Sequence, residues 1–187
     1  CGHSAAGKAE RNYASFCVEA VNNGFCALIV DPIGQGERQI SAGGGAETKH
    51  FLGPVDAHCF LDRKLVFHGQ QLVSYMIREA TAALDYLLSR PETDPERIAV
   101  AGNSGGGTMT AFMAAYDDRI KAAVSCSYIS DLQMVIEQIM AQDAEQCPEH
   151  FIEYGLNISD LVIASAPKPF FVGANLFDFF PIDGVRK

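Results

Sequence analysis

The spacing of apolar residues alternates along the chain between a helical and a strand-like pattern. Helical spacing predicts helices over residues 8–22, 70–89 and 105–116, and two or three short helices between 130 and 165. Short apolar runs predict strands over residues 25–30, 98–101, 122–127 and 170–174. The first run, FCALIV, is continuous, as in a strand that is buried on both faces.

This alternation of strand and helix predicts an α/β fold with a mostly parallel sheet flanked by helices. The 187 residues are enough for a single domain with one core, spanning residues 1–187. Residues 34–68, rich in glycine, charge and histidine, predict a long excursion from the sheet. In parallel sheets, ligands bind in the loops beyond the carboxyl ends of the strands. Those loops begin here at Asp31, Gly102, Ser127 and Asn175.

The strongest chemical signal is the stretch GNSGG at residues 102–106, which matches G-x-S-x-G. A predicted strand precedes it and a predicted helix follows, as a nucleophile elbow requires. In that turn the serine takes a strained backbone geometry that lifts its hydroxyl clear of the sheet, while Gly102 and Gly106 leave room for strand and helix to approach. The pattern predicts Ser104 as a nucleophile. The alternative is a glycine-rich turn with an incidental serine.

Composition narrows the classes of partner. Lys and Arg number 14 against 23 Asp and Glu, a formal net charge of −9, which argues against nucleic acid or an anionic membrane as partner. No apolar run approaches the roughly 20 residues that span a bilayer. The six cysteines form no C-x-x-C pair and lie mostly in apolar segments, which favours buried free thiols and a reducing, cytoplasmic compartment. The composition is compatible with a homo-oligomer as well as a monomer.

The opening stretch, CGHSAAGKAE, fits most of a phosphate-binding loop, because residues 2–8 read G-x-x-x-x-G-K. Asp31 and Gln35 could then stand for magnesium and switch elements. A working loop continues with Ser or Thr, but Ala9 holds that place, and no N-K-x-D motif follows. The nucleotide hypothesis also leaves residues 102–106 unexplained, and we therefore disfavour it.

Three segments together resemble the α/β-hydrolase family: DPIGQGE after one strand, TDPERIAVAGNSGGG through the elbow, and APKPFFVGANLFDFFPIDG at the last strand. The resemblance covers nearly the whole chain. With CGHSAAGK and DFFP, it is nearest to acetyl xylan esterases and dienelactone hydrolase-like carboxylesterases. It implies a serine hydrolase of small carboxylic esters, such as acetylated sugars, that works through an acyl-enzyme without cofactor or metal.

The resemblance also assigns roles to residues. Ser104 would be the nucleophile, and the backbone N–H of Gly105 one donor of the oxyanion hole. The second donor would come from the opening stretch, at Ser4 or Ala5, with His3 beside it. Asp178 would be the acid of the triad, with Asp131 as the reserve. Asn103 and His68 are further candidates for lining the site, and a helical insertion at 128–168 would cover its edge.

No histidine follows Asp178, although the family order is Ser, Asp, His. We therefore expect the catalytic histidine beyond residue 187, and a sheet that lacks its first strands and its last strand. By the family's topology, a strand is expected between residues 25–30 and the strand that leads to Ser104.

Two other functions remain as alternatives. The elbow and acid loop are shared with serine peptidases of the prolyl-oligopeptidase type. The absent histidine would suit a non-catalytic, hydrolase-like interaction module. Glu149, His150 and Glu153 could share a helical face as metal ligands, but no third cluster matches them, and a solvated face is the simpler interpretation.

Overall fold

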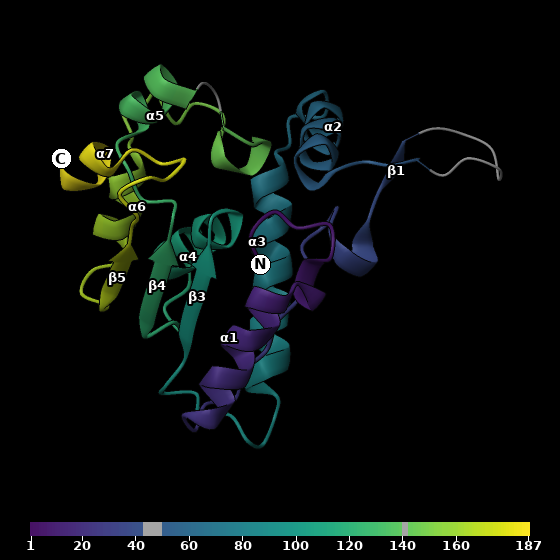
Figure 1. Ribbon diagram of the computed structural model, residues 1–187, viewed down its shortest axis with the longest axis vertical. Helices are drawn as coiled ribbons and strands as arrows, with labels where there is room; N and C mark the ends of the chain where they lie inside the picture. The colour runs from purple at the N-terminus through teal and green to yellow at the C-terminus, as the bar shows by residue number, and fades with distance from the viewer. Residues whose placement is uncertain (43–49, 140–141) are drawn as a thin grey trace.

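The computed structural model describes residues 1–42, 50–139 and 142–187. Its centre is a parallel three-stranded sheet in the order β3–β4–β5 (Figure 1). The strands are β3 (Ala99–Asn103), β4 (Ala122–Cys126) and β5 (Phe170–Gly173). Asn103 pairs in register with Cys126, and Cys126 with Gly173, so all three strands end at the same edge. The predicted parallel sheet is confirmed.

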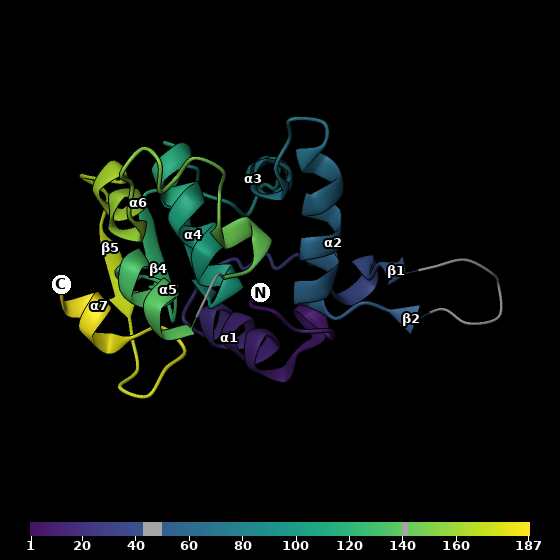
Figure 2. The same cartoon turned by 90° about the horizontal axis from the view of Figure 1, so that it is seen from above.

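Helices cover both faces of this sheet. The longer ones are α1 (Arg11–Asn22), α2 (Pro54–Val66), α3 (Leu72–Leu88) and α4 (Gly105–Tyr116); the shorter ones are α5 (Leu132–Ile139), α6 (Ile158–Ala164) and α7 (Ile182–Arg186). Figure 2 shows α3, α4 and α6 on one side of the strands and α1 on the other. α5 and α7 lie beyond the carboxyl ends of β4 and β5 (Figure 1). The smallest elements are the 3-10 turns η1 (Gly7–Ala9), η2 (Gly36–Arg38) and η3 (Ala144–Gln146), and an antiparallel pair, β1 (Ser41–Ala42) and β2 (His50–Phe51).

Among the described residues, the core consists of two groups of buried side chains. One lies between α3, β3 and α4 and comprises Leu84, Ile98, Met113 and Ile120. The other joins α4 to the segment after β4 and comprises Ala111, Tyr128, Ile129, Leu132, Val135, Ile158 and Phe180. Tyr128 is 2% exposed and meets Phe180 edge to face at a centroid distance of 5.7 Å. The described part of the predicted 128–168 insertion, which omits residues 140–141, therefore contributes to the core.

Two elements differ from the prediction. Residues 25–30 form no strand, and their apolar side chains are mostly exposed, with Phe25 at 63% and Val30 at 44%. A strand needs a neighbour for its backbone groups, and no described residue pairs with this run. The second difference is α2, which lies within the predicted excursion. Pro54 opens it, Asp56 lies in its first turn, and Arg63 and Lys64 lie in its last, which is favourable for a helix dipole.

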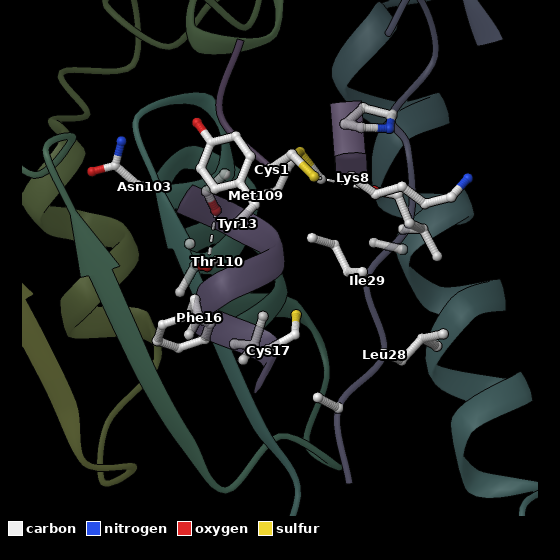
Figure 3. Close-up of a pocket in the computed structure, with 18 of the residues that line it drawn as sticks. Cys1, Lys8, Tyr13, Phe16, Cys17, Leu28, Ile29, Asn103, Met109 and Thr110 are labelled. Carbon is white, nitrogen blue, oxygen red and sulfur yellow. Dashed lines mark hydrogen bonds between the residues drawn. The ribbon is translucent and has the colours of Figure 1, made fainter. Parts of the chain in front are cut away.

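A cavity of about 1610 Å³ separates residues 25–30 from β3. In Figure 3, Tyr13 and Phe16 of α1 line it on one side, and Leu28 and Ile29 face it from the other. Met109 of α4 also contributes to the lining. The cavity therefore occupies the interval where the sequence predicts another strand.

The six cysteines are free, and none is fully buried, contrary to the expectation of buried thiols. Cys26 and Cys147 are exposed. Among the described residues, no helix combines the length and the apolar character needed to cross a membrane.

Candidate active site

Ser104 lies on the turn between β3 and α4, in a strained conformation. Its backbone has φ 56° and ψ −122°, outside the region that most side chains adopt. Two hydrogen bonds hold the turn: the Ser104 N–H donates to the Cys126 carbonyl at 2.9 Å, and the Ser104 carbonyl accepts from the Thr108 N–H at 2.9 Å. Strain that persists in this way is typical of functional sites. The geometry matches the predicted nucleophile elbow.

The glycines on either side of Ser104 permit this turn. A Cβ atom on Gly102 would overlap the carbonyl group of Gly106 and lie 2.9 Å from its Cα. A Cβ atom on Gly106 would lie 2.9 Å from the carbonyl oxygen of Cys1. Strand, helix and opening loop therefore meet at van der Waals contact, and no side chain fits between them.

The opening loop lies against the elbow. A Cβ atom on Gly2 would be 2.7 Å from the Asn103 carbonyl oxygen and 3.3 Å from the Ser104 Cβ. The imidazole of His3 covers Gly105, since a Cβ atom there would be 2.7 Å from His3 Cε1. The sequence predicts that this loop reaches the nucleophile, and the structure brings the two together.

The backbone N–H groups predicted as oxyanion donors in this loop differ in whether they already donate a hydrogen bond. The Ser4 N–H donates at 2.8 Å to the side-chain oxygen of Gln35, which is 1% exposed, so this N–H is already engaged. Ala5 is exposed. Among the described residues, no hydrogen bond from the N–H of Ala5 or of His3 is found, so both groups stay candidate donors beside the Gly105 N–H.

The lysine that suggested a phosphate-binding loop is occupied elsewhere. Lys8 donates through its backbone N–H to Asp31 Oδ1 at 2.5 Å and through Nζ to Asp31 Oδ2 at 2.9 Å. Asp31 is 6% exposed and also accepts from the Glu37 N–H at 3.1 Å. Lys8 and Asp31 therefore tie two loops together and do not surround an anion site.

Asp178, the predicted acid, lies half-buried in the loop after β5. It accepts hydrogen bonds from the Phe179 N–H at 2.6 Å and from Asn175 Nδ2 at 3.3 Å. Burial alone would raise the pKa of Asp178, but hydrogen bonds from the Ser127 hydroxyl, Asn175 and the backbone hold that pKa below its usual range. The carboxylate is therefore ionised at neutral pH, as a triad acid must be.

Asp131, the reserve acid, uses its carboxylate in contacts that stabilise the fold. It accepts the Met134 N–H at 3.1 Å, as a cap at the start of α5. Asn157 Nδ2 donates to it at 3.0 Å, and Lys187 Nζ lies 3.0 Å away. These hydrogen bonds lower the pKa of Asp131, the one from Lys187 contributing most. Asp131 therefore stabilises a helix terminus, and Asp178 is the better candidate for the acid.

Comparison of the whole structure with solved structures identifies the architecture. A structure described as a "putative acetyl xylan esterase" from Bacteroides fragilis superposes with a TM-score of 0.69 over 83% of this chain and 41% of that one, at 21% identity. An acetyl xylan esterase from Paenibacillus sp. R4 superposes with a TM-score of 0.56 over 94% of this chain and 66% of that one, at 19% identity. The chain has the α/β-hydrolase fold.

Sequence comparisons agree with this assignment. The sequence model of the Prolyl oligopeptidase family matches residues 69–160 of this chain, which include the elbow. The Bacillus subtilis protein named "Putative hydrolase YtaP" is 29% identical over 175 residues, covering 92% of this chain and 54% of that protein. The chain thus spans about half the length of the curated relative that it matches.

The remaining predicted site residues, His68 and Asn103, lie at the surface. His68 is on the exposed turn between α2 and α3, and Asn103, at the end of β3, is also exposed. His150 pairs with Glu153 at 2.6 Å on an exposed surface, which agrees with a solvated face. Within residues 1–42, 50–139 and 142–187, no histidine ring forms a hydrogen bond or ion pair with Asp178.

Sequence reasoning missed a buried cluster beside the elbow, which we call the His–carboxylate cluster: His3, His58, Asp143 and Glu145. His58 Nδ1 lies 2.9 Å from Asp143 Oδ2 and 2.9 Å from Glu145 Oε2. Burial would lower the pKa values of the two histidines. Contacts with Asp143 and Glu145 outweigh burial and raise the pKa of His3 to about 9 and that of His58 to about 10. His58 and the carboxylates are 85 and 87 residues apart, which no local pattern reveals.

Proposed function

We propose that the protein is a serine carboxylic-ester hydrolase acting on small esters. The observation that carries the proposal is the strained backbone of Ser104 at the start of α4, with the opening loop packed against it. A serine in this position presents its hydroxyl beyond the sheet edge, where a helix N-terminus stabilises negative charge.

In the proposed mechanism, Ser104 Oγ attacks the ester carbonyl carbon and loses its proton to a general base. The carbonyl oxygen becomes an oxyanion that accepts hydrogen bonds from the Gly105 N–H and the His3 N–H. Collapse of this intermediate releases the alcohol, which takes the proton, and leaves an acyl group on Ser104. Water then attacks the acyl-enzyme, which frees the carboxylic acid and restores the serine.

In this proposal, Asp178 orients the base and stabilises the positive charge that forms on it. Its ionised state and its place past β5 support this role. His3 and His58 face Asp143 and Glu145, so neither supplies the base in this arrangement. The proposal therefore assigns the base to no described residue and rests on Ser104 and its oxyanion donors.

The substrate class is proposed from the similar structures. Two of these are described as acetyl xylan esterases, which favours short acyl groups on a sugar alcohol. The match to the Prolyl oligopeptidase family favours a second candidate, a serine peptidase that uses the same elbow. Both chemistries form an acyl-enzyme, and they differ in the leaving group.

A panel of chromogenic substrates separates these functions. We expect the full-length protein to hydrolyse p-nitrophenyl acetate faster than longer acyl esters, and to leave a proline-containing peptide anilide intact. Preference for the anilide would favour the peptidase. A fluorophosphonate probe should label the protein, and Ser104→Ala should abolish both labelling and turnover. Ser15→Ala, at an exposed position on α1, is the matched control and should retain both. Equal activity in Ser104→Ala would overturn the proposal.

A further inference from the structure

The His–carboxylate cluster brings four possible metal ligands together from separate parts of the fold. His3 comes from the opening loop, His58 from α2, Asp143 from the residue before η3, and Glu145 from η3 itself. One ligand atom from each residue lies within 4.8 Å of all the others. His58 and Glu145 are 0% exposed and Asp143 is 6% exposed, whereas the His3 side chain keeps 16% of its surface accessible.

Neighbouring groups fix which atoms face the centre of the cluster. His58 Nε2 lies 2.8 Å from the Ile33 carbonyl oxygen, which can only accept, so Nε2 carries a hydrogen and Nδ1 faces the carboxylates. Asp143 Oδ1 accepts the Ala144 N–H at 2.7 Å and the Cys59 thiol at 3.7 Å, which leaves Oδ2 for the cluster. A backbone carbonyl behind a histidine is the usual support of a metal ligand.

Hydrogen bonding within the cluster leaves two buried atoms unsatisfied. His3 Nε2 lies 2.5 Å from Asp143 Oδ2 and 2.8 Å from Glu145 Oε1, but neither approach has hydrogen-bond geometry. His3 Nε2 and Glu145 Oε1 are therefore buried without a hydrogen-bond partner. Such atoms are costly and rare in folded proteins. Close approach without hydrogen-bond alignment is expected for atoms that converge on a common point.

We propose that His3, His58, Asp143 and Glu145 bind one divalent cation of the zinc class. Two imidazole nitrogens and two carboxylate oxygens form a four-ligand set that suits Zn²⁺, whereas Mg²⁺ and Ca²⁺ prefer oxygen ligands alone. The two carboxylates balance the charge of the ion, so its burial leaves no net charge.

The distances are compatible with this occupant. In a tetrahedral site with bonds of about 2.1 Å, ligand atoms lie about 3.4 Å apart. The four nitrogen–oxygen approaches in the cluster are 2.5, 2.8, 2.9 and 2.9 Å. Each would open by less than about 1 Å around the ion. Such shifts are within the reach of side-chain rotation, and the accessible edge of His3 gives the ion a way in.

Four protein ligands leave no open coordination position, so the ion would be structural and would not activate water. It would hold the opening loop to α2 and η3. Because the His3 ring covers Gly105, the ion would also fix the loop that borders Ser104. The side chain of His3 would thus position the loop beside Ser104, a role separate from that of its N–H as an oxyanion donor.

Metal binding is tested on tag-free, full-length protein that has been treated with a chelator and dialysed. We expect elemental analysis after addition of Zn²⁺ to find one ion per chain and the melting temperature to rise, with no rise for Mg²⁺ or Ca²⁺. Co²⁺ should give the strong visible absorption of a tetrahedral site without the near-ultraviolet band of thiolate ligation. A thiolate band would place the ion on cysteines and overturn the proposal.

Variants connect the ion to the cluster. His3→Ala and Glu145→Gln should each weaken Zn²⁺ binding by roughly tenfold or more. His150→Ala is the matched control, because it removes an exposed histidine that also faces a glutamate, and it should bind as the wild type does. The His3 side chain keeps 16% of its surface accessible, so its variant is expected to fold, and circular dichroism checks this. A folded wild type that binds no Zn²⁺, or variants that bind as tightly as the wild type, would overturn the proposal.

Discussion

Gly102→Ala is the sharpest test of the close packing at the elbow. The added methyl carbon would overlap the Gly106 carbonyl group and lie 2.9 Å from Gly106 Cα. Carbon atoms normally pack at about 3.5–4.0 Å, so β3 and α4 would have to separate by about 1 Å. Both obstacles are main chain, which cannot rotate away. Overpacking costs about 1–3 kcal/mol, and we expect this variant near the upper end, at about 3 kcal/mol.

The matched control is Gly155→Ala. Gly155 has φ +68° with nothing within 4 Å of an added Cβ, so alanine there suffers backbone strain without a clash. Such strain costs about 1–2 kcal/mol. Gly102 has no positive φ, so alanine there suffers the clash alone. The two variants therefore separate steric overlap from loss of glycine's backbone freedom.

Urea denaturation followed by circular dichroism gives the free energies of unfolding. With a slope of about 2 kcal/mol per molar urea, Gly102→Ala should lower the midpoint by about 1.5 M and Gly155→Ala by about 0.5–1 M. Fluorophosphonate labelling should fall in Gly102→Ala alone, because Ser104 moves with the strand. A smaller loss of stability in Gly102→Ala than in Gly155→Ala would refute the packing argument.

Three further predictions concern ionised groups. Asp178→Asn should lower kcat for p-nitrophenyl acetate by about 10³–10⁴-fold with little change in melting temperature, and unchanged kcat would exclude Asp178 as the acid. Asp131→Ala should cost about 1 kcal/mol through the lost cap of α5 and leave kcat per folded molecule unchanged; reduced kcat would return Asp131 to the site. In chelator-treated protein, the stability from protonated His3 and His58 should be complete below pH about 6.5 and lost as pH rises through about 9 to 10, because their folded pKa values are raised. Urea midpoints measured from pH 6 to 10 check this, and a midpoint that rises across that range would contradict it.

The elbow could be predicted from the sequence because its determinants are local. A strand, the residues 102–106 and a helix follow one another without interruption, and close packing dictates the small residues at both ends. The parallel sheet was predictable for the same reason, since β3, β4 and β5 are separate apolar runs joined through helical segments.

Residues 25–30 show the limit of this approach. Their apolar run has the composition of a buried strand, but composition does not say which strand will pair with it. In the structure no described strand does, and the run remains exposed. Conversely, α2 was not predicted, because the sequence around it is polar and rich in glycine. Pro54 at its start and Arg63 and Lys64 at its end were signals that could have indicated the helix.

The His–carboxylate cluster could not be predicted for a different reason. Its members come from four places along the chain, and His58 and Glu145 are 87 residues apart. Neither histidine stands in a metal-binding motif. Asp143 and Glu145 precede Cys147 in a polar stretch that reads as an ordinary loop. Only tertiary folding, which places η3 over α2 and the opening loop, reveals their common environment.

The cavity beside β3 has a consequence for how residues 1–187 would associate in solution. Among the described residues, β3 pairs with β4 alone, so its other edge presents backbone donors and acceptors to open space. Apolar side chains such as Phe16, at 58% exposure, and Phe25, at 63%, surround that edge. An unpaired strand edge with an apolar border invites pairing between molecules. Residues 1–187 produced in isolation would therefore tend to associate edge to edge, and the fraction of associated molecules should rise steeply with protein concentration.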